Sequence, residues 1–276
     1  RGSKGNVGLG SVLGPAGAML CEMANLGLPV APGFCVAPGG KEPARPEAWR
    51  GEVKQAVAEL EDATGQALGC QTAPLLLSVF CNCGDQETRL TNLGMNDAIV
   101  EYRAVSDNPR CAWDCYRRLI WNFSKCVKRL DMNPFEEALA SVRDRLDSTC
   151  KLGRKHDDCD IPKKDLQDLV QAFKSLYAQQ VGTDFPQDPH DQLSEALATA
   201  FAAGEQQNAH AIVQAMALGN CDSAAVAGWA YASSSEGHIA ELRGEWLSNA
   251  QCEDLATGAR TPLRLTLDDS RDWAVA

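Results

Sequence analysis

The chain has 276 residues, 45% of them hydrophobic and 23% charged, and these proportions exclude a disordered protein and allow one large domain or two smaller ones. Its formal net charge of -11 excludes a typical nucleic-acid binder, which needs clustered Lys and Arg, and favours a neutral or basic protein partner. No apolar run approaches the roughly 20 residues of a membrane-spanning helix, so we expect no transmembrane segment.

The first third of the chain predicts single elements separated by loops. The Gly-rich residues 2–17 predict a loop, and residues 18–23 predict a short helix. Two prolines flank the alternating apolar residues 28–36, as at an edge strand. Apolar residues recur at helical spacing over residues 49–64, whereas residues 75–80 are typical of a buried strand.

The rest of the chain predicts helices followed by strands. Apolar residues have helical spacing through most of residues 98–203, interrupted by a charged loop at residues 151–160. Short apolar stretches at residues 211–217, 226–232 and 263–267 then predict strands. The order of sheet, helices and sheet predicts a mixed α/β fold in which the flanking parts complete one unit around a helical insertion.

The twelve cysteines and four histidines do not have the spacing of a metal site. The close pairs are Cys81/Cys83 and Cys111/Cys115, and the histidines are His156, His190, His210 and His238. We expect reduced thiols in a cytosol or an organelle matrix, and no metal. A redox role for a cysteine pair stays open as an alternative, because an electropositive setting would make such a thiol reactive.

A series of motifs occurs in an order that resembles one known family. Residues 18–34, which end in Gly-Leu-Pro-Val-Ala-Pro-Gly-Phe, resemble the N-terminal signature of pyruvate phosphate dikinase. Further matches follow in the same order at residues 74–79, 92–97, 108–118, 182–189, 213–220, 244–254 and 260–262. The chain therefore resembles the nucleotide-binding region of the pyruvate phosphate dikinase family from about Gly14 to Pro262.

The resemblance implies an ATP-grasp-like unit with a helical insertion. We expect residues 1–97 to form its first part, residues 98–204 the insertion and residues 205–276 its second part. In that family the region passes phosphate to a histidine on a swivelling domain, which then phosphorylates pyruvate in a C-terminal barrel. Nothing in this sequence resembles the histidine domain or the barrel.

Three positions that are cationic in the family are neutral here. By the resemblance, Ala16 stands at the lysine of the first phosphate loop, Phe80 at an arginine after the buried strand, and Ser233 at an arginine after a later strand. A different alignment would use Lys4, which lies far upstream of the helix, and Arg89 could substitute for an arginine although a surface role fits it better. Triphosphates need such cations.

The loop regions around the expected site have changed as well. Asp85 and Glu87 follow the buried strand in a shortened segment and would repel a triphosphate. Residues 204–207 form a short polar crossing where the family has a longer segment with arginines. The first change adds negative charge, and the second removes positive charge, where phosphates would bind.

Some family residues on the adenine and magnesium side survive. They are Glu245, Gln251, Glu253, Asp254 and Arg260. We favour a structural role for them in helix capping and local hydrogen bonds. A residual nucleotide site built from Glu245, Gln251 and Arg260 is the alternative.

We therefore expect a pseudoenzyme without a cofactor that acts as a structural or interaction subunit of a larger complex. By the family's location, we expect it in an organelle matrix or stroma, with a plastid favoured and the cytosol as an alternative. Peripheral association with a membrane complex, such as a photosynthetic one, is included in this expectation. Two other hypotheses remain, a nucleotide-binding regulator or residual phosphotransferase, and a redox-responsive adaptor.

Overall fold

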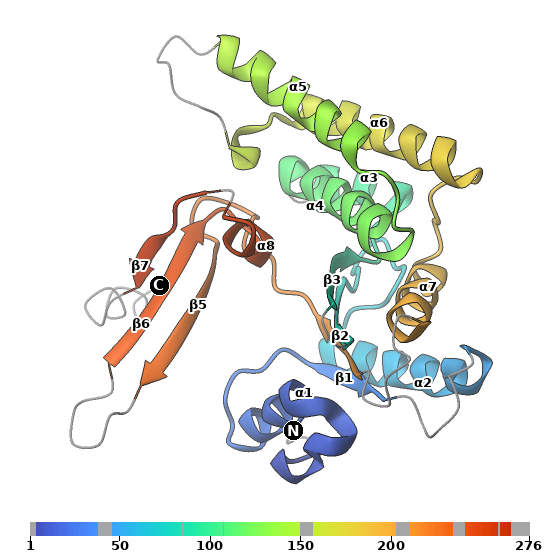
Figure 1. Cartoon of the computed structure of the whole chain (residues 1–276), viewed down its shortest axis with the longest axis vertical. Coiled ribbons are helices and arrows are strands. Elements are labelled where there is room, and N and C mark those ends of the chain that lie inside the picture. Colours follow the sequence, from blue (N-terminus) through green and yellow to red (C-terminus); the bar gives the residue numbers. More distant parts are fainter. Residues whose placement is uncertain are drawn as a thin grey trace. The chain divides into compact units, whose positions relative to one another are not determined.

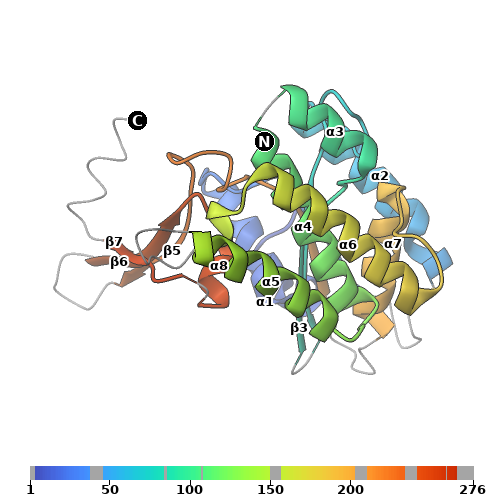
Figure 2. The same cartoon turned by 90° about the horizontal axis from the view of Figure 1, so that it is seen from above.

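The computed structural model describes residues 4–37, 46–83, 86–106, 108–149, 157–202, 210–233, 241–258 and 260–265. The chain divides into two compact units. Unit 1 comprises Arg1–Leu139 and Lys163–Ala217, and unit 2 comprises Ala140–Pro162 and Leu218–Ala276. Figures 1 and 2 show their elements from two directions.

A four-stranded antiparallel sheet forms the centre of unit 1. Its strands are β1 (Gly33–Val36), β2 (Leu77–Cys83), β3 (Gln86–Leu93) and β4 (His210–Ala215), in the order β1-β4-β2-β3. β4 lies between β1 and β2, so Val213 pairs with both Phe34 and Val79. Buried aliphatic side chains line the sheet at Leu77, Val79, Leu90, Leu93 and Val213. Segments far apart in the sequence therefore share one core.

The N-terminal helix approaches this sheet through small residues. A short 3-10 turn, η1 (Val7–Leu9), leads into α1 (Gly10–Asn25). The helix is interrupted at Gly14, whose φ of 74° and ψ of 161° are not helical. Pro15 follows at the first position of the continued helix, where the N–H that proline lacks would have no helical partner. Gly14, Gly17 and Ala18 are the buried residues of α1.

Helices make up the remainder of unit 1, and the second half of one of them, α5 (Asn133–Thr149), belongs to unit 2. They are α2 (Pro46–Thr64), α3 (Asp97–Ser106), α4 (Pro109–Asn122), the π-helical η2 (Phe123–Val127), α5 (Asn133–Thr149), α6 (Lys163–Val181) and α7 (Pro189–Ala202). α4 packs against α6 and β3. Between them lies an aromatic core in which the Phe185 ring is 5.4 Å from Phe123, 5.3 Å from Tyr177 and 6.1 Å from Tyr116. All four side chains are almost completely buried.

A buried ionic cluster lies on α4. The Asp114 carboxylate accepts hydrogen bonds from Arg117 Nη2 at 2.7 Å and from Arg118 Nε at 3.0 Å, and all three side chains are buried. Burial alone would raise the pKa of Asp114, but the guanidinium groups of Arg118, Arg117 and Arg110 outweigh it and hold the pKa well below its usual range. Asp114 is therefore ionised in the folded protein.

A smaller antiparallel sheet and one short helix form the described part of unit 2, together with the end of α5 and the 3-10 turn η3 (Asp158–Asp160). The strands β5 (Val226–Ser233), β6 (Glu241–Ser248) and β7 (Leu263–Leu265) follow in that order. Helix α8 (Cys252–Ala256) joins β6 to β7. Its Leu255 packs against a small core formed by Ala227, Leu247 and Ala250. Figure 1 shows α8 at one end of this sheet.

The predicted mixed fold of helices and sheets is confirmed, and strands occur at each predicted strand region. The predicted opening loop over residues 2–17 is wrong in part, because helix begins at Gly10. Close packing of small residues against the sheet favours helix there over an open loop. The predicted boundaries at residues 97/98 and 204/205 stay predictions. The crossing at residues 204–207 lies outside the described residues.

Candidate functional site

The predicted phosphate loop lies at the kink of α1. Ala16 is exposed and offers only a methyl group, whereas Gly14 is buried against the His210 imidazole of β4. A Cβ atom at Gly14 would come within 2.8 Å of that ring. Burial lowers the pKa of His210, so the imidazole is neutral at pH 7 and adds no cation. Sequence reasoning did not bring His210 to this loop, because only the pairing of β4 places it there.

The alternative lysine of the first loop is held elsewhere. Lys4 Nζ lies 2.7 Å from Glu59 Oε2 of α2, and both side chains are exposed. Hydrogen bonding to Lys4 and its charge lower the pKa of Glu59. This ion pair connects Lys4 to α2.

An arginine lies next to the second neutral position. Phe80 of β2 pairs with Arg89 of β3, and Arg89 Cζ lies 5.5 Å from the centre of the Phe80 ring. This distance is within the range of a cation–π contact. The neighbouring strand therefore supplies a guanidinium at the position where the resemblance implied one was lost. Asp85, which we expected to repel phosphates here, lies outside the described residues, as does the side chain of Glu87.

The surviving polar residues of unit 2 support the turn that follows β6. Gln251 is the N-cap of α8, forms a capping box with Asp254 and donates from Nε2 to Asn220 Oδ1 at 3.1 Å. Arg260 Nη1 donates to the carbonyl oxygens of Ser248 and Asn249 at 2.9 and 3.3 Å. Its Nε lies 3.5 Å from Asp157 Oδ2. Gln251 and Arg260 thus have structural partners in the same turn.

Glu245 lies apart from that turn, on β6. It pairs with Trp229 of β5 and with Arg264 of β7. Because paired residues project to the same face of a sheet, Glu245 shares its face with an aromatic and a cationic side chain. Ser233, the third neutral position, pairs with Glu241 at the end of β5, and its side chain lies outside the described residues. The structure therefore brings Gln251 and Arg260 together but not Glu245.

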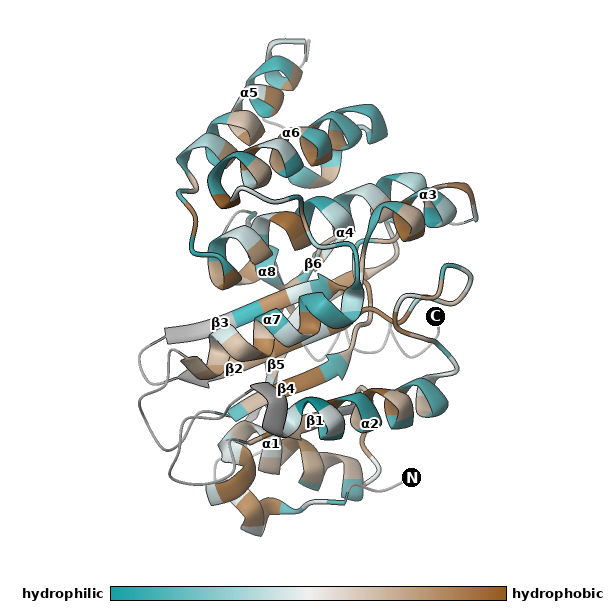
Figure 3. Cartoon of the chain, turned by 90° about the vertical axis from the view of Figure 1, so that its right-hand side faces the viewer, coloured by the Kyte–Doolittle hydropathy of each residue, from teal (hydrophilic) through white to brown (hydrophobic). Residues whose placement is uncertain are grey.

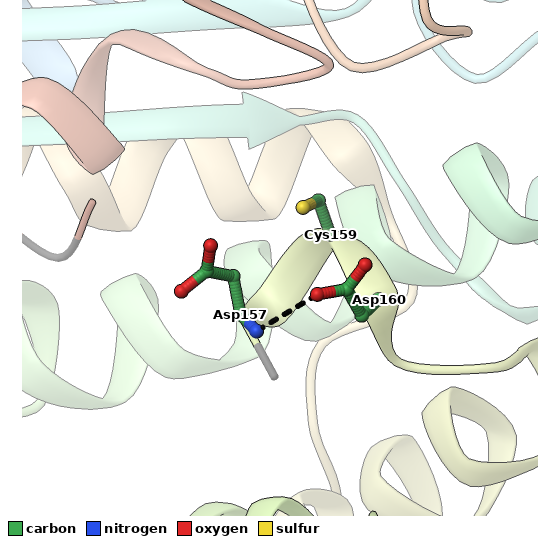
Figure 4. A group of neighbouring side chains, drawn as sticks. All are labelled: Asp157, Cys159 and Asp160. Carbon is green, nitrogen blue, oxygen red and sulfur yellow. Dashed lines mark hydrogen bonds between the residues drawn. The ribbon is translucent and has the colours of Figure 1, made fainter. Parts of the chain in front are cut away.

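Three acidic or thiol groups gather at the turn before α6. Side-chain ligand atoms of Asp157, Cys159 and Asp160 lie within 4.8 Å of one another (Figure 4). Asp160 Oδ2 accepts a hydrogen bond from the Asp157 backbone N–H at 3.0 Å, which closes a capping box around η3. Arg143 also pairs with the adjacent Asp158. Capping accounts for this cluster without an ion. His156 and His238 lie outside the described residues.

The thiols differ in their environments. Burial, with a contribution from nearby Cys21, raises the pKa of Cys35 to about 11. A hydrogen bond with the Thr72 hydroxyl, at 3.3 Å, is the main cause of a lowered pKa at Cys70. The Sγ atoms of the buried pair Cys111 and Cys115 lie 3.9 Å apart. Sequence reasoning singled out the close pairs and missed Cys70.

Exposed apolar side chains occur along the N-terminal segment. We call them the α1 surface, and they are Val7, Leu9, Val12, Met19, Leu26 and Leu28. Figure 3 shows α1 as largely apolar along its length. Met19 is 54% exposed and Leu26 is 70% exposed, while the small residues Gly14, Gly17 and Ala18 are buried. The helix therefore buries its smallest side chains and displays its larger apolar ones.

The same segment is the one part of the described chain that resembles a membrane span. The stretch Val7–Asn25 is long enough and has a mean hydropathy of 1.3, which by itself is weak support for a span. We expected no transmembrane segment, and this stretch is the one described segment that is long and apolar enough to be a candidate. Non-helical Gly14 interrupts its helix.

Comparison with known proteins relates most of the chain to one group of enzymes. "Pyruvate, phosphate dikinase" of Rhizobium meliloti is 34% identical over 92% of the chain. "Pyruvate, phosphate dikinase 1, chloroplastic" of Arabidopsis thaliana is 32% identical over 94%, and the Clostridium symbiosum dikinase is 30% identical over 95%. The chain spans about three tenths of the length of these relatives, 30%, 29% and 32% respectively. No family model matches the chain.

These relatives correct one prediction. We expected from Ala16, Phe80 and Ser233 that the chain is not an enzyme, but the relatives that match nearly all of it at 30–34% identity are enzymes by name. Neutral residues at three positions do not demonstrate loss of activity, and Arg89 shows that a neighbouring strand can supply a cation. The chain is a relative of the pyruvate, phosphate dikinases and corresponds to their N-terminal region.

Proposed function

We propose that the chain serves as a protein-interaction subunit of a larger assembly. The α1 surface is the observation that supports this proposal. Monomeric proteins seldom expose contiguous apolar patches larger than roughly a few hundred Å², and patches above that size mark contacts with other proteins. Contact through α1 does not exclude catalysis elsewhere in the fold. The names of the relatives raise that possibility separately.

The packing of α1 on the sheet accounts for the exposure of its larger apolar residues. Gly17 lies so close to β1 that a Cβ atom there would be 2.7 Å from Cys35 Sγ, and Gly14 is equally close to His210. Glycines at these positions let the helix backbone approach the sheet. The larger side chains of Met19 and Leu26 point away from the sheet and stay exposed. Burying them would stabilise a complex by about 25 cal/mol for each Å² of apolar surface removed from water.

The family resemblance supplies the finer parts of the proposal. The fold would be ATP-grasp-like, with its first part at residues 1–97, the insertion at 98–204 and the second part at 205–276. Several relatives are named chloroplastic, which favours a plastid as the location. The net charge of -11 favours a neutral or basic partner. The apolar α1 surface suits peripheral contact with a membrane complex.

A paired surface substitution tests this function. Met19→Glu with Leu26→Glu places two charges on the α1 surface, and Val105→Glu places one on α3, where Val105 is 89% exposed. Tagged versions are expressed in the source cells and separated by native electrophoresis. We expect the wild type and Val105→Glu to run within a large assembly and the double variant to run free. A folded double variant that stays in the assembly would overturn the proposal.

A second candidate is a nucleotide-binding region that takes part in phosphoryl transfer. Two observations favour it: the relatives are dikinases by name, and the guanidinium of Arg89 lies over Phe80, where a phosphate cation is implied. The resemblance also assigns Glu245, Gln251 and Arg260 of unit 2 to nucleotide binding; Glu245 lies on β6, and Gln251 and Arg260 support the turn that follows it.

Calorimetry with magnesium-ATP tests the second candidate, the nucleotide-binding region. Under this second candidate, wild-type protein binds with sub-millimolar affinity and Arg89→Ala weakens binding at least tenfold, through loss of a charge-assisted contact worth about 1.5–3 kcal/mol. Arg103→Ala, a change on α3 away from β3, serves as the matched control and should leave binding unchanged. Absence of binding in the wild type would remove the second candidate.

A further inference from the structure

β5 is an edge strand without the usual protection. Among the described residues its one neighbour in the sheet is β6. Its sequence, Val-Ala-Gly-Trp-Ala-Tyr-Ala-Ser, contains no charge and no proline, and its eight pairs with β6 run without a bulge. Charges, prolines and bulges are the devices by which edge strands avoid pairing with another strand. Within the part of the chain that the structure describes, no strand pairs with the outer side of β5.

The direction of the backbone groups shows which residues would pair. The carbonyl oxygen of Trp229 faces Gly244 of β6, and that of Glu245 faces Gly228. Trp229 and Glu245 therefore bond to each other across the two strands. Since backbone groups alternate along a strand, those of Gly228, Ala230 and Ala232 point outward. An extended peptide can form backbone hydrogen bonds with such outward-facing groups at the edge of a sheet.

The side chains continue this pattern on one face. Ala227, Trp229 and Tyr231 project to the same side, because they are two residues apart. α8 covers that face at Ala227, but Trp229 and Tyr231 lie beyond it and are 43% and 67% exposed. Their rings contact each other at 4.9 Å. The hydrophobic stripe thus continues past the helix that covers its first part.

We propose that β5 pairs antiparallel with β5 of a second copy of this chain, about a two-fold axis at Ala230. The outward residues fix this register, since Gly228 then bonds with Ala232 of the second copy and Ala230 faces its own counterpart. Trp229 of each copy lies opposite Tyr231 of the other. Two identical aromatic pairs therefore form on one face. The inference goes beyond the proposed function, because it does not involve the α1 surface.

The strand itself favours a second copy over an unrelated strand. Its outward groups and its two aromatic residues are symmetric about Ala230, so one surface complements itself, as a two-fold interface requires. No charge within β5 opposes the contact. The net charge of -11 on each chain repels over longer distances and is screened by salt. A ladder this short buries less than the roughly 1,200 Å² of a stable interface, so we expect half-dimerisation on the order of 100 µM.

Sedimentation equilibrium on the purified chain is the first test. We expect the average mass to rise from the 29.7 kDa monomer towards twice that value as concentration increases, and to rise further when salt is added. A single monomer mass at every concentration and salt level would overturn the inference. If β5 amides of such a monomer gained protection from hydrogen exchange on addition of a different protein, the edge would pair with a foreign strand. The inference that β5 pairs with a second copy would still be overturned.

A charge swap at the axis is the second test. Ala230→Lys and Ala230→Glu each place two like charges face to face in the dimer, so each variant alone should stay monomeric at concentrations where the wild type pairs. An equimolar mixture should recover dimers that contain one of each variant, as native mass spectrometry can count. Misfolding could not produce this recovery. Leu263→Lys on β7 is the matched control and should dimerise as the wild type does. Failure of the mixture to pair, or equal loss in the control, would overturn the inference.

Discussion

The helical core of unit 1 and the small sheet of unit 2 differ in the burial of their aromatic residues. Around Phe185, four aromatic rings are buried together, and the nearby charges on α4 have buried partners. In unit 2 a core of three small or aliphatic residues lies under α8, while Trp229 and Tyr231 remain exposed on the same sheet. The aromatic core of unit 1 is thus fully buried, whereas the aromatic residues of β5 in unit 2 would be buried only by a further contact.

This contrast shows where stability and binding are separable. Changes in the core of unit 1 should act on folding, whereas changes on the β5 sheet or the α1 surface should act on assembly. The N-terminal helix belongs to unit 1 but resembles unit 2 in this respect, because its larger apolar residues are outside. The substitutions below test that division.

Removing the charge of Asp114 should have the largest effect on stability. Asp114→Asn removes the negative charge that the buried guanidinium groups of Arg117 and Arg118 contact, and we expect the free energy of unfolding to fall by about 3–5 kcal/mol. Urea denaturation measures the change. Asp168→Asn on the exposed face of α6 is the control and should change stability by less than about 0.5 kcal/mol. Equal effects would contradict the contrast.

The same cluster predicts a loss of stability in acid. The pKa of Asp114 is lowered on folding, so its ionised form contributes stability at any pH above the unfolded value near 4. That contribution decreases as pH falls from about 4 towards the lower folded pKa. The difference in stability between wild type and Asp114→Asn should therefore shrink from pH 7 to pH 3. A difference that grows in acid would show that the ion pairs do not stabilise the fold.

Truncating one aromatic residue in each region compares them directly. Phe185→Ala opens a cavity among three rings and should lower the free energy of unfolding by about 3–5 kcal/mol. Trp229→Ala removes a side chain that is 43% exposed and should cost less than about 1 kcal/mol in the monomer. Thermal unfolding of dilute protein measures both. A large cost for Trp229 would mean that unit 2 depends on it for its own fold.

A smaller effect is expected at the kink of α1. Gly14→Ala adds a Cβ at a positive φ and against the His210 ring, and we expect a loss of about 1–3 kcal/mol. Gly10→Ala is the control, since a Cβ there meets no atom within 4 Å. Chemical denaturation followed by circular dichroism would distinguish them. Similar stability of both variants would show that the close approach of α1 to β4 is unimportant.

The thiols should show the smallest effect, a difference in rate. Cys70 should react with iodoacetamide at neutral pH faster than Cys35, because the pKa of Cys70 is lowered and that of Cys35 is raised to about 11. Mass spectrometry of peptides after timed labelling measures the two rates. Cys252, which is exposed, serves as the reference. Equal rates at Cys35 and Cys70 would remove the basis for a redox-responsive role.

The sequence predicts most of the fold where apolar spacing is strong. The helices between residues 98 and 203 and the strand β2 follow directly from that spacing. β3 and β6 were not predicted as strands, because charges such as Arg89 and Arg243 interrupt their apolar residues. The helix over Gly10–Asn25 was predicted too short, since glycine disfavours helix and its packing against β1 is a tertiary effect.

The candidate site was less predictable than the fold. The motifs located Ala16, Phe80, Gln251 and Arg260, but a side chain's neighbours depend on strand register. Only the pairing of β2 with β3 places Arg89 over Phe80, and only the packing of α1 on the paired strands β1 and β4 brings His210 near Gly14. The sequence raised Arg89 as a possible substitute but could not show that it lies over Phe80. The prediction of a chain without enzyme activity was wrong because its relatives are enzymes by name.

The native mass of the protein in a gentle extract of its own cells tests the central proposal most directly. If the chain is an interaction subunit, most of it should migrate in an assembly much larger than a 59 kDa dimer, twice 29.7 kDa, and charges at Met19 and Leu26 should release it. Migration of all the protein as monomer or dimer, with no change on substituting Met19 and Leu26, would contradict the account.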